Sequence, residues 1–371
     1  MKIQFDKNPE QIELIKALAS DNKTVAVEAQ EAFAAFISEV VQQVLLQAGT
    51  ASMIYRDVEF DEDDSPSIPL DLYYGLNEGH ISVWSQTVGG GLPTNFVQGM
   101  QEMKINTYRL DSAISMDKRY VRRARLDVVA AGLERMANEI LVKQERNAWA
   151  VILKLLADAQ TSSSRHILRS TSTGAANFQV DDINRLWTLV RRLNAAYTGG
   201  TPQALQSRGL TDIFVSPEVK EKIRAFAYQP MNTRPGSITS SGATSVALPD
   251  SVREEIYRAA GTQEIFGVTI NELLELGPGR KYTQLFSTFA GSTSYDGGTF
   301  GATDDLIVGI DASRNAFLRP VAIQSESRGQ VKVLPDDQFL ARSQKVGFYS
   351  FVEEGRVAVD ARAAVGLIAR A

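Results

Sequence analysis

LTDIFVSPEVKEKIRAF, residues 210–226, joins a short apolar strand to a helix. Ile213 to Val215 read as the strand, Ser216 can cap the helix, and Pro217 suits its first turn because that position needs no backbone donor. The helix then carries apolar residues at helical spacing, at Val219, Ile223 and Phe226. The stretch predicts a mixed lobe in which strand and helix alternate.

A longer helical signal precedes this lobe, from Asp117 to about Gln160. No proline interrupts it, and its apolar residues step by three and four: Leu126, Val129, Leu133, Met136 and Ile140. At 1.5 Å per residue, one helix of this length runs on the order of 60 Å. We expect a spine helix whose apolar stripe is a core.

Arginines gather at the start of this predicted spine, at Arg119, Arg122, Arg123 and Arg125. Their guanidinium groups could contact phosphates or pair with carboxylates of a neighbouring subunit. We favour contact between subunits for Arg119, Arg122 and Arg123.

Two extended runs, Ile68–Tyr74 and Lys104–Asp111, read as the legs of a long hairpin. The segment between them is rich in glycine and carries four large apolar residues, Ile81, Val83, Trp84 and Phe96. Loops of this length usually have a partner or a function. We therefore expect these four residues to make intersubunit contacts.

Residues 24–48 carry apolar residues at mixed three and four spacings and end at Gly49, which predicts an amphipathic helix with a glycine stop. Its stripe of Phe and Val at 33–45 suits packing on protein. An acidic run follows, at Asp57, Glu59, Asp61, Glu62, Asp63 and Asp64. Oxygen ligands of this kind could bind a hard cation, but the ligand spacing of a calcium loop is missing, so a solvated patch is favoured.

Composition excludes several classes of protein. The 371 residues include 39 Lys and Arg and 44 Asp and Glu, which gives a net charge of −5. This charge does not suit a protein that binds a nucleic-acid backbone through its phosphates. Zero cysteines exclude disulfides, thiol nucleophiles and thiolate metal sites. The sequence contains neither a secretory signal nor an apolar run long enough to span a membrane.

No residue pattern indicates a catalytic, cofactor-binding or metal site. His80 and His166 are the only histidines, and their glycine-rich and serine-rich surroundings favour solvated surface positions. Residues 277–281 resemble a phosphate loop only loosely, so a plain turn is expected. An enzyme would need an unrecognised acid/base pair, for example Asp336 with Asp337 or Glu353 with Glu354.

An amphipathic arm, a glycine-rich hairpin, a spine helix, a mixed lobe and a closing β segment follow in this order. The order resembles that of the major capsid proteins of tailed bacteriophages, whose fold is shared with herpesvirus capsids and encapsulins. The stretches DDLIVGIDASRNAFLRPVAIQ (304–324) and LPDDQFLARSQKVGFYSFVEEGRVAVDARAAVGL (334–367) are similar to the closing part of such subunits, and residues 210–226 resemble their A-domain.

The resemblance implies an α+β capsid fold in five segments: an N-arm at 1–55, an E-loop at 56–112, a P-domain with the spine helix at 113–177, an A-domain at 178–335 and closing P-domain strands at 336–371. It also implies partners. These are further copies of the chain in hexamers and pentamers, a separate scaffolding protein, a portal and decoration or cement proteins.

The leading hypothesis is a structural subunit of an icosahedral shell around double-stranded DNA, without cofactor or membrane, assembled in the host bacterial cytoplasm. The mild negative charge suits a wall along which DNA slides. Two alternatives stay open, an encapsulin-type compartment that holds a cargo enzyme and an enzyme with one of the acid/base pairs above.

Overall fold

The computed structural model describes residues 9–20, 22–47, 49–61, 64–69, 102–122, 126–159, 165–170, 177–197, 209–228, 263–265, 267–323, 330–336 and 345–370. These residues form helices and sheets in two compact units, so the predicted α+β class is confirmed. Unit 1 takes the described residues within 9–69, 102–148 and 317–357, and unit 2 takes those within 149–316 and 358–370.

Unit 1 is built from four helical segments and the strands of two sheets. Its elements are α1 (Pro9–Leu18), α2 (Lys23–Gln47), η1 (Ala51–Met53), β1 (Arg56–Asp61), β2 (Ser67–Pro69), β3 (Glu102–Lys104), β4 (Tyr108–Asp117), α3 (Lys118–Arg122), β12 (Phe317–Ile323), β13 (Lys332–Asp336) and β14 (Lys345–Glu354). The longest helix, α4 (Leu126–Asp158), begins in unit 1 and continues into unit 2 after Ala148.

The large sheet of unit 1 is organised around β14. Its strand order is β1-β12-β14-β13, and β4 pairs with β14 over the whole length of both strands, from Lys345 opposite Asp117 to Glu354 opposite Tyr108. Strands β2 and β3 form a separate antiparallel pair, Ser67 opposite Lys104. This pair is the base of the predicted hairpin, and residues 70–101 between the two strands lie outside the described ranges.

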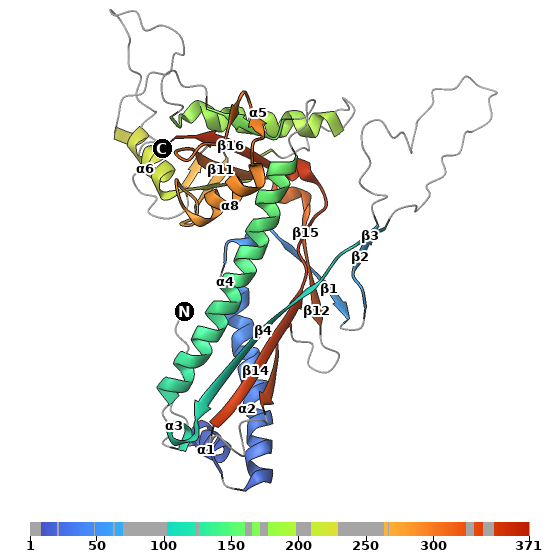
Figure 1. Ribbon diagram of the computed structural model, residues 1–371, viewed down its shortest axis with the longest axis vertical. Coiled ribbons are helices and arrows are strands. Elements are labelled where there is room, and N and C mark those ends of the chain that lie inside the picture. Colours follow the sequence, from blue (N-terminus) through green and yellow to red (C-terminus); the bar gives the residue numbers. More distant parts are fainter. Residues whose placement is uncertain are drawn as a thin grey trace, which may run out of the picture. The chain divides into compact units, whose positions relative to one another are not determined.

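The core of unit 1 lies between the helices and one face of the β4–β14 ladder (Figure 1). Leu133 on α4 and Phe348 on β14 are each 1% exposed, and the rings of Phe33 on α2 and Phe348 lie 5.4 Å apart. Burial of a large apolar side chain contributes about 1.5–3 kcal/mol. The predicted N-arm helix α2 is therefore part of a core rather than a tether.

Two predictions about this region are wrong in their boundaries. Strand β4 continues to Asp117, six residues beyond the predicted end at Asp111, because every second side chain faces the core. The predicted single helix from Asp117 begins with α3, and α4 starts at Leu126. With 33 residues, α4 is about 50 Å long.

Unit 2 holds a second six-stranded sheet and the remaining helices. Its elements are β5 (Ile167–Arg169), α5 (Val180–Tyr197), β6 (Asp212–Val215), α6 (Pro217–Tyr228), β7 (Gln263–Ile265), β8 (Val268–Glu272), α8 (Lys281–Ala290), β9 (Ser294–Tyr295), β10 (Gly298–Thr299), β11 (Asp305–Ile310), η4 (Ala312–Arg314), η6 (Ala361–Ala363) and β16 (Ala364–Ala369). The short strand β15 (Val357–Ala358) marks the chain's passage from unit 1 to unit 2.

The sheet of unit 2 has the strand order β5-β16-β11-β6-β8-β7 and is covered on both faces. Helices α5 and α6 pack on one face, and α5 runs along β16 and β11 (Figure 1). On the other face, the ring of Trp149 lies 5.0 Å from Phe214 of β6 and 5.8 Å from Tyr282 of α8. All residues of β11 and β16 are buried, as expected for strands covered on two sides.

The predicted strand and helix at 210–226 are confirmed. Strand β6 ends at Val215, Ser216 Oγ accepts a hydrogen bond from the Val219 amide at 3.2 Å, and Pro217 opens α6. Helix α5 begins at Val180 and carries Asp181 and Asp182 in its first turn.

Helix α8 and the hairpin β9–β10 lie between β8 and β11 in the chain. Tyr295 of this hairpin is fully buried and packs on Phe286. The predicted closing segment 336–371 is divided between the units, since β14 joins one sheet and β16 the other.

Candidate functional site

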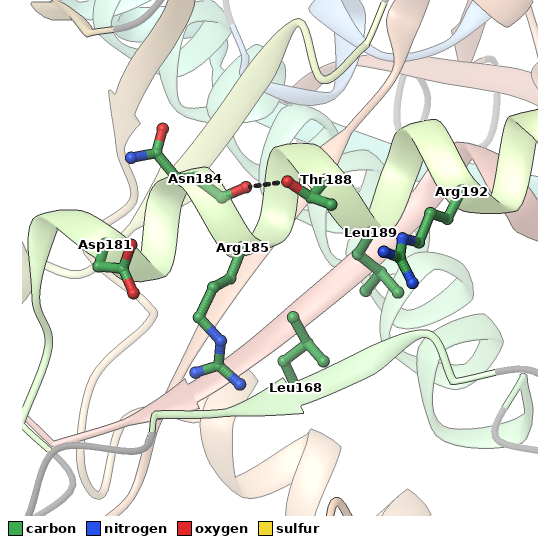
Figure 2. Close-up of a pocket in the computed structure, with 7 residues that line it drawn as sticks. All are labelled: Leu168, Asp181, Asn184, Arg185, Thr188, Leu189 and Arg192. Atoms are coloured by element: carbon green, nitrogen blue, oxygen red, sulfur yellow. Dashed lines mark hydrogen bonds between the residues drawn. The ribbon is translucent and has the colours of Figure 1, made fainter. Parts of the chain in front are cut away.

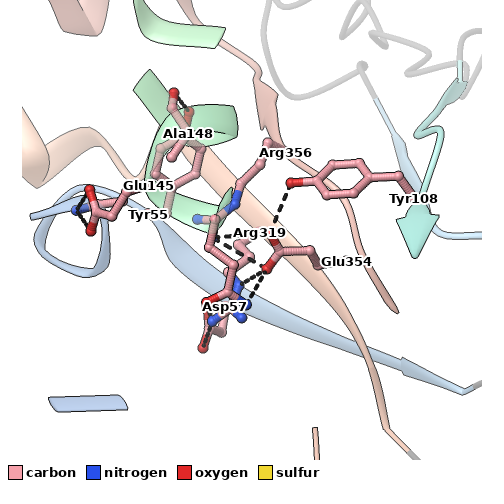
Figure 3. Close-up of polar contacts among 10 residues, drawn as sticks. Tyr55, Asp57, Tyr108, Glu145, Ala148, Arg319, Glu354 and Arg356 are labelled. Atoms are coloured by element: carbon pink, nitrogen blue, oxygen red, sulfur yellow. Dashed lines mark hydrogen bonds and ion pairs between the residues drawn. The ribbon is translucent and has the colours of Figure 1, made fainter. Parts of the chain in front are cut away.

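A buried ionic cluster occupies the centre of unit 1, around the carboxylate of Glu354 (Figure 3). Glu354 Oε1 accepts a hydrogen bond from Tyr108 Oη at 2.8 Å. Its Oε2 accepts from Arg319 Nε at 2.8 Å and from Gln144 Nε2 at 3.1 Å. The guanidinium of Arg356 donates to the same oxygen at 3.3 Å. One carboxylate thus joins α4, β4, β12 and the segment after β14.

Two further residues complete this cluster. Arg319 also lies 3.5 Å from Asp57 of β1, so two carboxylates face two guanidinium groups and the charges sum to zero. Arg356 lies over the ring of Tyr55, 4.8 Å from its centre, and Tyr55 Oη donates to the Ala148 carbonyl at 2.9 Å. Such pairing is what allows charged groups to be buried.

The cluster also holds its phenols in the neutral form. Burial raises the pKa of Tyr108 to about 12, and the charge of Glu354 adds to the increase. Burial likewise raises the pKa of Tyr55 far above its usual value. Neither phenol is therefore suited to act as a base, and both serve as hydrogen-bond donors.

Of the acid/base pairs considered from the sequence, Glu353 with Glu354 does not bring two carboxyl groups together. Glu353 and Glu354 are neighbours on a strand and point to opposite faces, since Glu353 accepts from Thr107 while Glu354 enters the cluster. Both oxygens of Glu354 are occupied by donors. Asp336 ends β13, and Asp337 lies outside the described residues.

Unit 2 has a shallow pocket between α5 and the edge strand β5 (Figure 2). It has a volume of about 340 Å³ and is lined by Leu168, Asp181, Asn184, Arg185, Thr188, Leu189 and Arg192. Arg185 is held in place by Asp182 at 3.2 Å and by the Arg169 carbonyl at 3.1 Å. The pocket therefore combines an apolar floor with basic side chains whose positions are partly fixed.

Helix α2 presents a second apolar side away from the core. Val25 is 41% exposed and Phe36 is 37% exposed, while Phe33 and Ile37 are buried. Eleven residues at about 100° each bring Val25 and Phe36 to the same side of the helix. The predicted stripe at 33–45 is thus divided between an inner and an outer face, and Val40, Val44 and Leu45 lie where side chains are not described.

The predicted intersubunit residues fall mostly outside the described ranges. This holds for Ile81, Val83, Trp84 and Phe96 and for Arg123. Arg119 is exposed on α3, and Arg122 ends that helix without a described side chain. Their contact role stays a prediction.

The predicted spine residues lie on α4. Leu133, Met136 and Ile140 are 1%, 3% and 3% exposed and belong to the core of unit 1. Leu126 and Val129 lie near the start of α4, where side chains are not described.

One histidine prediction is wrong. His166 is buried, with Nδ1 3.1 Å from the Ala364 carbonyl, because it directly precedes the buried strand β5. Burial lowers the pKa of its imidazole, which favours the neutral ring. His80 lies outside the described residues.

Two other expectations concern turns and acidic residues. Residues 277–280 form the expected turn, with the Arg280 amide donating to the Gly277 carbonyl at 3.0 Å. In the acidic run, Glu59, Asp61 and Asp64 are exposed, whereas Asp57 pairs with Arg319. Across the described ranges, no group of three or more His, Asp or Glu side chains is placed to hold a metal ion. Within the same ranges, no helix has the length and apolar character needed to cross a bilayer.

Sequence reasoning missed the partnership of Glu354 with Arg319 and the burial of Asp305 on β11. Each carboxylate lies at one end of a mainly apolar strand. Glu354 ends the strand KVGFYSFVEE, and Asp305 begins the strand DLIVGI. A charge within such a run is the signal that indicates a buried partner.

Comparison with solved structures gives remote similarities over most of the chain. The capsid of cyanophage P-SCSP1u aligns with 85% of this chain and 86% of its own, at 14% identity and a TM-score of 0.49. A structure of Microbacterium phage Oxtober96 aligns with 87% of this chain and 90% of its own, at 12% identity and a TM-score of 0.48. The capsid of cyanophage Pam1 covers 86% and 88%, at 10% identity and a TM-score of 0.47.

Neither a protein-family profile nor a curated protein sequence matches the chain.

Proposed function

We propose that this chain is a structural subunit that associates with copies of itself. More specifically, it is a major capsid protein of a tailed bacteriophage, which assembles as hexamers and pentamers into an icosahedral shell around double-stranded DNA. Its place is the virion capsid, and assembly takes place in the host bacterial cytoplasm.

One observation carries this proposal, the order of the elements along the chain. The arm helix α2, the hairpin base β2–β3, the spine helix α4, the mixed lobe with β6 and α6, and the closing strand β14 follow one another as the sequence resemblance implies. The hairpin base supports the assignment of residues 70–101 to an E-loop, since β2 and β3 pair directly at its two ends.

The buried chemistry supports a structural role. Glu354 is fully buried and bound by four donors, which suits it to hold strands together. The exposed apolar side chains of α2, Val25 and Phe36, supply surface that a neighbouring copy can cover.

The partners follow from the same proposal. Further copies of the chain form the shell, a separate scaffolding protein directs its size, and a portal and decoration or cement proteins complete it. The net charge of −5 suits an inner wall that encloses DNA without binding a particular sequence.

Electron microscopy of the purified full-length protein tests the proposal, with light scattering to measure the size of the assemblies in solution. Closed shells or capsomer rings, formed alone or with a coexpressed scaffolding protein, are the expected result. A homogeneous monomer under both conditions would overturn it. Shells that contain a cargo enzyme and no DNA would assign the chain to an encapsulin-type compartment.

A further inference from the structure

Asp305 is a buried acid at the start of β11 in unit 2. It is fully buried, and its Oδ2 accepts a short hydrogen bond from Ser216 Oγ. Among the described residues, its Oδ1 has no hydrogen-bond partner. A charge at such a buried position is costly unless it is paired.

A second carboxyl group lies beside the same helix end. Glu218 belongs to the first turn of α6, two residues after Ser216, and its buried Oε2 also has no partner within the described residues. The Glu218 carboxyl packs on the backbone of Gly277, where an added Cβ would lie 2.9 Å from Oε2. Gly277 also has a φ of +127°, a backbone conformation that residues with side chains rarely adopt. Both this conformation and the nearby Glu218 carboxyl therefore disfavour a side chain at this position.

The neighbouring charges are paired elsewhere. On α6, Lys220 pairs with Glu272 of β8 at 2.8 Å. Asp304, which precedes Asp305, pairs with Arg169 at 3.1 Å and with Arg370 at 3.3 Å.

The remaining nearby groups do not neutralise Asp305 either. The Cγ of Arg280 lies against Gly277, 3.4 Å from the position of an added Cβ. Across the β11–β16 ladder, the residue opposite Asp305 is the uncharged Ala369. The first-turn amide of Val219 donates to Ser216 Oγ. The helix end therefore supplies Asp305 with the Ser216 hydroxyl and no cation.

These surroundings favour the protonated form of Asp305. Burial, with a smaller contribution from the charge of Glu218, raises its pKa from 3.8 to about 6 against the lowering effects of Ser216 and the Leu306 amide. The difference corresponds to roughly 100-fold tighter proton binding in the folded chain than in an exposed aspartate.

We propose that Asp305 is a proton-binding group, with Glu218 as its neighbouring charge, and that it makes the junction between β11 and α6 sensitive to pH. A proton on Asp305 removes one of two neighbouring negative charges. A group whose pKa is raised by folding stabilises the fold below its unfolded pKa, and this contribution is lost as the pH rises through its folded pKa. The first turn of α6 is therefore held most firmly in acid and loosens above about pH 6. This group acts within one chain and does not depend on assembly.

Hydrogen–deuterium exchange of the full-length chain tests this proposal, measured from about pH 5 to about pH 8 and corrected for the intrinsic rate. Protection of the first turn of α6 should fall by about 10-fold between these two pH values in the wild-type chain. Asp305→Asn keeps the shape and removes the charge, so its protection should stay high and change little with pH. Glu218→Gln should move the midpoint to lower pH, and the exposed Glu221→Gln should behave as the wild type.

Infrared difference spectra provide a second measurement that does not rely on Asp305→Asn folding. The wild-type chain should show a protonated-carboxyl band that disappears with a midpoint near pH 6, and Glu218→Gln should shift that midpoint downward. A band missing at about pH 5, or a midpoint unchanged by Glu218→Gln, would overturn the proposal. So would a wild-type exchange profile that Asp305→Asn reproduces.

Discussion

Arg319 donates from Nε to the fully buried carboxylate of Glu354, and 2.8 Å separates Nε from Oε2. The two residues lie on β12 and at the end of β14, strands whose register is given by Val321 opposite Glu354. The backbone ladder between β12 and β14 is short. The side-chain hydrogen bonds of Glu354 therefore contribute much of the interaction between these two strands. An ion pair therefore supports the junction of β12 and β14 in unit 1.

Glu354→Ala should destabilise unit 1 strongly. It leaves the guanidinium groups of Arg319 and Arg356 buried without their carboxylate, and removing one partner of such a pair costs about 3–5 kcal/mol. Urea unfolding followed by circular dichroism measures the loss. Glu353→Ala is the matched control, because Glu353 makes one bond to Thr107 on the other face of β14, and it should cost about 1 kcal/mol. Equal losses would show that the cluster does not stabilise the sheet.

His166→Asn should change how stability depends on acid. Burial lowers the pKa of His166 in the folded chain, so the wild-type fold loses stability as the pH falls below the unfolded value of 6.5. Asparagine can still donate to the Ala364 carbonyl but does not titrate. The melting temperature of the variant relative to the wild type should therefore rise from about pH 7 to about pH 5. A difference that is constant over this range would contradict the prediction.

Leu133→Asp should prevent normal folding of unit 1. It places a carboxylate at a position that is 1% exposed and surrounded by apolar side chains, at a cost of several kcal/mol, on the order of 4. Insoluble or unassembled protein is the expected outcome in sedimentation and electron microscopy. Glu139→Gln on the exposed side of α4 should give normal protein, and similar behaviour of the two variants would disprove the assignment of faces.

Trp84→Ala tests the contact role of the hairpin segment, which rests on the sequence. A tryptophan buries about 150–250 Å² at a contact, an upper bound of about 4–6 kcal/mol at 25 cal/mol per Å². The variant should keep the far-ultraviolet circular dichroism of the wild type while shells form in lower yield or melt at lower temperature. Shells as abundant and heat-resistant as the wild type's would remove Trp84 from assembly.

Local chemistry was enough to predict the elements whose ends carry strong signals. Ser216 and Pro217 define the start of α6 through a hydroxyl cap and a missing amide. Gly49 ends the arm helix region as expected, with a φ of +119°. In each case, the determining interaction lies within a few residues of the chain.

The features that were missed depend on partners far away in the sequence. Helix α8, KYTQLFSTFA, is stabilised by Tyr282 and Phe286 packing on Trp149 and Tyr295, and its threonines gave no helical signal. Glu354 lies 246 residues from Tyr108 and 210 from Gln144, so no local pattern could indicate their contact. The burial of His166 likewise follows from the strand after it and not from the serines before it.

Strand β16 lies in the interior of the unit 2 sheet, parallel to β5 and antiparallel to β11. During synthesis, β5, β6, β8 and β11 are made before residues 364–369. Until those residues are made, β5 lacks its neighbour in the sheet, and the unpaired edge of β11 can pair with another nascent chain. The hydrogen bonds that link β5 to the rest of the sheet become available only once Ala369 has emerged from the exit tunnel. The sheet of this unit is therefore completed only after its other strands have been made, and chaperones that shield open strand edges would act on it in that interval.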